Sequence, residues 1–193
     1  LQLEALAEAD PEGVVHLDIA RSRATQEVLL RTDPVPGFGW RGLAPADLGE
    51  HAVRSTGQGL TNGLVTILPD QSDGTFSLNG VAGMGKIVDD GDEGDTYNWS
   101  PPAFDGAIER PQDVDVLVTE AGPVRGRMEI TRRYRWPTRI DGGRRVGPID
   151  VFIYTTVELR AGEDLVRVTV RFDNPSTDHR VRAWFPLPEP AAQ

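Results

Sequence analysis

The residues with the clearest chemical potential lie between Asp89 and Pro102, in the sequence DDGDEGDTYNWSPP. Five acids fall within the first seven positions, and the aromatic residues Tyr97 and Trp99 follow on either side of Asn98. Carboxylates and amides hydrogen-bond to hydroxyl groups, and an aromatic face can stack on a sugar ring. One interpretation of the pattern is therefore a saccharide-binding loop.

The same composition also fits a solvated acidic turn whose aromatic rings fold back onto the core. Asp and Gly favour turns, and Pro101 and Pro102 each remove a backbone donor. We therefore expect a loop from Asp89 to Pro102, because no packed strand or helix favours these residues. Structural turns are more common than binding sites, so composition alone favours the turn, and both interpretations stay open.

Nucleophilic and phosphate-binding sites have little support. The chain has no Cys and no G-x-S-x-G sequence, and His16, His51 and His179 lie far apart in the sequence. The glycines between residues 80 and 85 have the wrong spacing for a dinucleotide-binding loop. Neighbouring acids on a loop also do not provide the fixed separation, about 5 to 9.5 Å, that glycoside hydrolysis needs between two carboxylates.

Two stretches could hold a metal ion. A calcium loop of the EF-hand type starting at Asp90 fails, because its fifth position is Gly94 and its twelfth is Pro101, although a calcium site of another kind stays open. His16 and Asp18 share one face of a predicted strand and could both reach a zinc ion. No second His is near them in the sequence, so we favour a half-exposed strand pair and expect no metal site in this chain.

Length and charge limit the class of protein. A chain of 193 residues can bury a substantial core, and its net charge of −10 argues against nucleic acid and anionic membranes as partners. The chain contains no run of about 18 apolar residues, the length needed to cross a bilayer. The N-terminus lacks Met, a basic start and an apolar block, so we expect a piece of a longer protein without a signal peptide.

Alternating apolar and polar residues predict strands along most of the chain. The predicted strands cover residues 14–20, 26–31, 51–54, 64–68, 75–78, 114–119, 124–136, 149–160, 165–173 and 179–185. Turns are predicted at residues 62–63, 70–74, 141–143 and 161–164, where Gly, Asp and Asn gather. About ten strands joined in this way predict an all-β protein, an antiparallel β-sandwich.

The stretch from Asp89 to Pro102 resembles the D-x-G-D-x-G-D-x-Y-N-[YW]-S-P-P segment of glycoside hydrolase family 38, the α-mannosidases. It is most similar to the bacterial, mannosylglycerate-hydrolase-like branch. Three further parts of the family pattern follow the same order in this chain. They are VPGFGW at 35–40, the hairpin of residues 60–76, and FDNPSTDHRVRAWFP at 172–186.

This resemblance implies a galactose-mutarotase-like super-sandwich and three regions of chain. Residues 1–34 would be N-terminal strands of a preceding small β domain, residues 35–186 the family 38 sandwich segment, and residues 187–193 a Pro-rich tail or linker. Family 38 enzymes are retaining α-mannosidases with a divalent cation, usually zinc. They hold the cation and the aspartate nucleophile in an N-terminal α/β domain, and their H-x-D-x-x-W motif has no counterpart here.

The chain is therefore expected to be a non-catalytic sandwich segment, without catalytic residues or cofactor of its own. Its partners would be the catalytic domain of the same polypeptide and a mannose-containing saccharide, in a bacterial cytoplasm. By position in the motif, Tyr97 would reach the sugar, with Asn98 and Asp95 beside it as substrate-binding residues. The alternative is a free-standing carbohydrate-binding or scaffold module.

Two local expectations follow for the site. Tyr97 and Trp99 alternate along an extended loop and should point to opposite sides, with Trp99 packed on the sandwich and Tyr97 facing out. The cluster of Asp178, His179, Arg180 and Arg182 is expected to be structural, holding two strands in register.

Overall fold

The computed structural model describes residues 28–32, 34–35, 37–40, 42 and 48–188. The chain divides into two compact units, residues 1–30 and residues 31–193. All eleven strands of the described part of the chain belong to the second unit, together with one short 3-10 helix, Gly49–His51. No helix in the described residues is long and apolar enough to cross a membrane.

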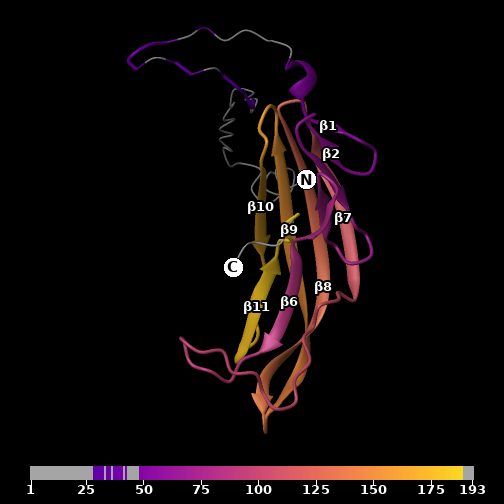
Figure 1. Cartoon of the computed structure of the whole chain (residues 1–193), viewed down its shortest axis with the longest axis vertical. Helices are drawn as coiled ribbons and strands as arrows, with labels where there is room; N and C mark the ends of the chain where they lie inside the picture. The colour runs from indigo at the N-terminus through magenta and orange to yellow at the C-terminus, as the bar shows by residue number, and fades with distance from the viewer. Residues whose placement is uncertain (1–27, 33, 36, 41, 43–47, 189–193) are drawn as a thin grey trace, which may run out of the picture. The chain divides into compact units, whose positions relative to one another are not determined.

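The strands form three antiparallel sheets (Figure 1). The five-stranded sheet contains, in order, β1 (Arg54–Ser55), β2 (Leu60–Thr61), β3 (Thr66–Pro69), β4 (Phe76–Leu78) and β5 (Val81–Met84). The four-stranded sheet has the order β10 (Val166–Arg171), β9 (Arg144–Arg160), β8 (Arg125–Asp141) and β7 (Asp113–Ala121). The two-stranded sheet pairs β11 (His179–Trp184) with β6 (Lys86–Gly91). The predicted antiparallel all-β sandwich is confirmed.

The long hairpin of β8 and β9 is the frame of the fold. Its turn, Asp141-Gly142-Gly143, needs positive φ at both glycines, where residues with a side chain are strained. Side chains alternate across β8, so every second residue is buried. The buried ones are Gly126, Met128, Ile130, Arg132, Tyr134 and Trp136.

Two apolar clusters lie along this one face of the hairpin. Met128 and Ile130 pack with residues of the five-stranded sheet, including Leu60, Ile67 and Phe76. Farther along β8, Tyr134 and Trp136 form the second cluster together with Ile87, Val151 and Ile153. The four-stranded sheet is thus one layer, and the two smaller sheets cover successive lengths of it.

Arg132 lies on β8 between the two clusters. The chain passes from β5 to β6 through Gly85, and the Arg132 side chain donates from Nη1 to the Gly85 carbonyl oxygen at 2.7 Å and from Nη2 to Thr155 Oγ1 at 2.7 Å. The side chain is fully buried, and this burial lowers the pKa of the guanidinium. A charged group in this position fixes where one cluster ends and the next begins.

Some strand predictions are wrong. Residues 28–31 contain no strand, and residues 51–54 hold the end of the 3-10 helix and the start of β1. Strands β5 and β6 were not predicted at all, because their glycines and acids are poor strand formers by local pattern. The strand predicted at residues 14–20, with His16 and Asp18, lies outside the described residues.

Candidate functional site

The acidic stretch divides into a strand and a loop. Asp89, Asp90 and Gly91 belong to β6 and are buried, with Asp89 fully inaccessible and Asp90 only 7% exposed. The expectation of a loop from Asp89 onward is therefore wrong for these three residues. Their burial is possible because cations from distant parts of the chain neutralise both carboxylates.

Asp89 joins β6 to β11 through a buried ionic network. Its Oδ1 lies 2.6 Å from Nδ1 of His179, and its Oδ2 forms an ion pair with Arg145. The other ring nitrogen of His179 lies 2.9 Å from Oδ1 of Asn174, an oxygen already fixed as an acceptor by the backbone N–H of Ser176. Both ring nitrogens thus lie within hydrogen-bonding distance of an oxygen atom, and these two contacts fix the orientation of the ring.

Asp90 has its own pair of cations on β11. Arg180 lies directly opposite it in the register and donates from Nε at 3.2 Å and from Nη2 at 3.1 Å, one contact to each carboxylate oxygen. Arg182 donates from Nη2 to the same carboxylate at 2.5 Å. These contacts, with that of His179, hold β6 and β11 in register, as predicted for this cluster.

Two of the three remaining acids, Asp92 and Asp95, shape the loop that follows. Asp92 Oδ1 accepts hydrogen bonds from the N–H groups of Gly94 and Ser100, each at 2.9 Å, and closes the loop at its base. Asp95 Oδ1 accepts those of Tyr97 and Asn98, also at 2.9 Å. These backbone hydrogen bonds lower the pKa of both carboxyl groups. The loop is therefore held by its own carboxylates.

Tyr97 faces solvent as predicted, whereas Trp99, predicted to pack on the sandwich, keeps about half of its surface exposed. Tyr97 is 91% exposed, whereas Trp99 is 48% exposed and donates from its indole nitrogen to the Gly91 carbonyl oxygen at 3.1 Å. The guanidinium of Arg180 lies 4.1 Å from the centre of the Trp99 ring, as in a cation–π contact. Trp99 anchors the loop on the two-stranded sheet, and Tyr97 points away from it.

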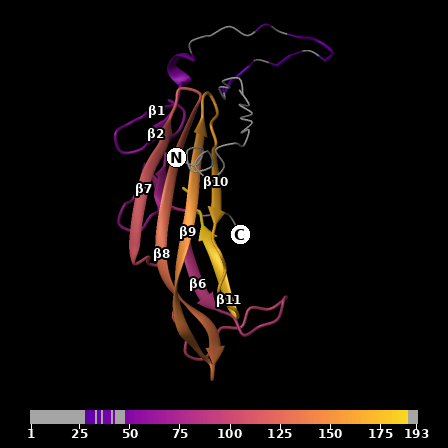
Figure 2. The ribbon, with the colours of Figure 1, turned by 180° about the vertical axis from the view of Figure 1, so that it is seen from behind.

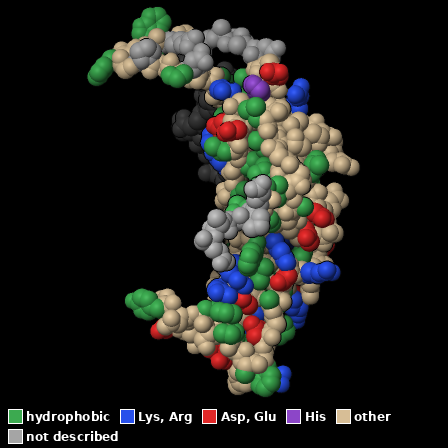
Figure 3. Space-filling model, viewed as in Figure 1, with side chains coloured by type: hydrophobic (Ala, Val, Ile, Leu, Met, Phe, Trp, Pro, Cys, Tyr) green, Lys and Arg blue, Asp and Glu red, His purple; other side chains and the backbone are tan. Residues whose placement is uncertain are grey.

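A second contact between an arginine and a tryptophan lies farther along the outer face of β11. Arg182 lies 5.3 Å from the ring centre of Trp184, which is half exposed. Hydrophobic and basic side chains accordingly lie next to each other over β6 and β11 (Figure 3). The sequence pattern identified the arginines of this face but not their partners, because nothing local relates them to Asp90.

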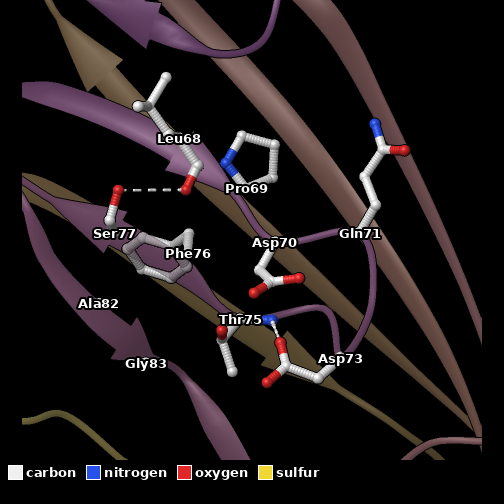
Figure 4. A pocket seen from close by; sticks show the side chains of 10 residues that line it. All are labelled: Leu68, Pro69, Asp70, Gln71, Asp73, Thr75, Phe76, Ser77, Ala82 and Gly83. Carbon is white, nitrogen blue, oxygen red and sulfur yellow. Dashed lines mark hydrogen bonds between the residues drawn. The ribbon is translucent and has the colours of Figure 1, made fainter.

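A separate hollow lies at the β3–β4 hairpin, with a volume of about 630 Å³ (Figure 4). Asp70 and Asp73 lie at its rim and accept hydrogen bonds from the N–H groups of Ser72 and Thr75, both at 2.8 Å. These contacts form the tight turn predicted there. None of the predicted substrate-binding residues lines this hollow.

Within the described residues, no group of three or more His, Asp and Glu side chains is arranged to hold a metal ion. Asp89 and Asp90 are engaged by His179 and arginines, and Asp92 and Asp95 by backbone N–H groups. These four carboxylates are therefore already engaged within the fold.

This layered arrangement is a β-sandwich of the kind found within glycoside hydrolase family 38 α-mannosidases. Two solved structures share it: an α-mannosidase from Enterococcus faecalis V583 (TM-score 0.61) and a glycosyl hydrolase family 38 protein from Enterococcus faecalis (TM-score 0.59). Both are 17% identical to this chain over 65% of its length, and the match spans 17% and 18% of their own chains. No protein-family model and no curated protein sequence matches the chain.

Proposed function

We propose that this chain is the non-catalytic β-sandwich segment of a retaining, metal-dependent α-mannosidase of family 38. In this proposal the loop of residues 92–102 completes one wall of the substrate pocket, whose nucleophile and metal belong to a catalytic domain of the same polypeptide. The shared fold supports the family, and the short match relative to the similar enzymes supports a segment.

The observation that carries the role of the loop is the contrast between its base and its tip. The base is tied to β6 by Trp99 and closed by Asp92, while Tyr97 is almost fully exposed. An exposed aromatic hydroxyl on a loop with fixed backbone is suited to meet a ligand at low entropic cost. In this proposal, Tyr97 contacts a sugar hydroxyl across the domain boundary.

Asn98 and Asp95 have supporting parts in this proposal. Asn98 follows Tyr97 on the exposed side of the loop and has an amide that can both donate and accept hydrogen bonds. Asp95 uses one carboxylate oxygen to fix the backbone of both residues. Its second oxygen is the one that would accept a hydrogen bond from the sugar.

The first test replaces Tyr97 by Phe in the complete enzyme, after the coding sequence before Leu1 has been read for the H-x-D-x-x-W motif. The change removes one hydroxyl and keeps the ring. Catalytic efficiency on an aryl α-mannoside should fall by roughly 5- to 100-fold, the equivalent of about 1–3 kcal/mol for one lost hydrogen bond. The melting temperature should barely change, because the hydroxyl lies in solvent.

Tyr154→Phe is the matched control, because Tyr154 is half exposed on the outer face of the four-stranded sheet. It should leave both kinetics and stability unchanged. Unaltered kinetics for Tyr97→Phe would remove the loop from the active site. A coding sequence without a catalytic domain would instead favour the free-standing carbohydrate-binding or scaffold module.

A further inference from the structure

Figure 2 shows the strands of the four-stranded sheet from the side opposite to that of Figure 1. The outer face of this sheet carries a second hollow, with a volume of about 450 Å³. Its floor is made by Thr156 of β9 and Thr169 of β10, which lie directly opposite each other in the register. Long side chains surround these two short ones, and this difference in length makes the hollow. The rim residues are Arg127, Glu129, Glu158, Arg160, Arg167 and Arg171.

The rim is basic, although the chain as a whole carries a net charge of −10. Four arginines and two glutamates line it, and Glu163 next to it pairs with Arg167, so the formal charge of the group is 4 − 3 = +1. Glu158 is shared by Arg127 at 2.8 Å and Arg160 at 2.6 Å, which leaves one positive charge in that group. A positive hollow on an acidic protein selects for anions by charge complementarity.

In the described part of the chain, the unpaired positive charge of the hollow lies on one side of it, at Arg171. Arg167 pairs with Glu163, whereas the described residues provide no ion pair or hydrogen bond for the Arg171 side chain. Arg171 lies on β10, the outermost strand, and Glu129 lies two strands away on β8. An anionic group would therefore bind toward Arg171, and a hydroxyl group of the same ligand would face Glu129.

We propose that this hollow binds a small hydroxylated molecule that carries one carboxylate or phosphate group. Arg171 would donate hydrogen bonds to the anionic group, which is the strong, charge-assisted kind of contact. The hydroxyls of Thr156 and Thr169 would contact it from the floor. This site is separate from the Tyr97 loop, since it lies on another sheet, and it does not depend on the proposed α-mannosidase activity.

The test titrates the purified 193-residue chain with galacturonate, galactose 6-phosphate and galactose. Binding would be followed by calorimetry at a constant ionic strength of about 0.1 M, so that charge screening is equal in all titrations. We expect one or both of the acidic sugars to bind and galactose to bind at least tenfold more weakly. Which acidic sugar binds more tightly distinguishes a carboxylate from a phosphate ligand.

Arg171→Gln should weaken binding of the preferred acidic sugar about tenfold, as expected for loss of one charged hydrogen bond. The control is Arg135→Gln. Arg135 lies on the same face of the sheet but outside the hollow, where it pairs with Asp150, so its replacement also removes one positive charge. It should change the affinity less than twofold. Thr156→Val keeps the shape of the side chain and removes one hydroxyl from the floor of the hollow, and it should weaken binding about fivefold. This variant tests the proposal if Arg171→Gln does not fold.

Three results would overturn the proposal. The first is no binding of either acidic sugar, and the second is binding of galactose as tight as that of the acidic sugars. The third is an equal loss of affinity in Arg171→Gln and Arg135→Gln, since that would show a general effect of charge and not a site.

Discussion

Trp136 and Trp99 should contribute differently to the stability of the fold, because they differ in burial. Trp136 is fully buried in the second apolar cluster, while Trp99 keeps about half of its surface in solvent. Trp136→Ala should lower the free energy of unfolding by about 3–5 kcal/mol, because a large cavity is left. Trp99→Ala should cost less, about 2 kcal/mol, for the burial of half a ring, a cation–π contact and the indole hydrogen bond to Gly91.

Urea unfolding of both variants measures this difference. Equal losses of stability would contradict the half-exposed position of Trp99. In the complete enzyme, Trp99→Ala should also reduce activity if Trp99 anchors the Tyr97 loop, whereas a core substitution such as Trp136→Ala should act mainly through stability.

Glu158 makes the stability of the sandwich depend on pH. Burial alone would raise the pKa of its carboxyl group, but hydrogen bonds from Arg127 and Arg160 outweigh this, and the pKa lies below the usual 4.5. The fold thus stabilises the ionised form. This contribution is complete above the pKa of the unfolded chain and is lost as the pH falls through the lower pKa of the folded chain.

The predicted outcome is measured by urea unfolding between pH 7 and pH 3. Wild-type stability should decrease as the pH falls below about 4.5, the reference pKa of Glu158. Glu158→Gln should be less stable at pH 7 and should show a shallower decrease in acid, because one of the titrating carboxylates has been removed. An unchanged acid slope would show that Glu158 does not provide this stability.

At the scale of elements, the short pairing of β6 with β11 depends on buried charge. Asp89→Asn would leave Arg145 and His179 facing a neutral amide, although both side chains are only 5% exposed. Breaking a buried ion pair from one side typically costs about 3–5 kcal/mol. The control, Asp113→Asn, changes an exposed acid at the start of β7 and should be close to neutral.

Amide hydrogen exchange locates the effect. In Asp89→Asn, protection should fall first in β6 and β11, while the centre of the β8–β9 hairpin stays protected by its apolar clusters. A uniform loss of protection over all three sheets would instead show that the ionic network supports the whole fold and not this pair of strands.

At the scale of the whole molecule, we expect the 193-residue chain alone not to hydrolyse an aryl α-mannoside. In the described residues, arginines engage the carboxylates of Asp89 and Asp90, backbone N–H groups engage those of Asp92 and Asp95, and no group of three or more His, Asp and Glu side chains could hold a metal ion. Retaining hydrolysis needs two carboxylates at a fixed separation of about 5–5.5 Å. Turnover above background by the purified chain, with zinc added and contaminants excluded, would contradict this prediction.

Elements whose signal is local can be predicted from the residues alone. Alternation from Met128 to Trp136 defined the buried face of β8, and Asp141-Gly142-Gly143 defined its turn, because side-chain direction and positive φ depend only on neighbouring residues. The tertiary structure alone decided that Asp89 and Asp90 form a strand. Their cationic partners Arg145 and Arg180 lie 56 and 90 positions away, and without these arginines neither carboxylate could leave water.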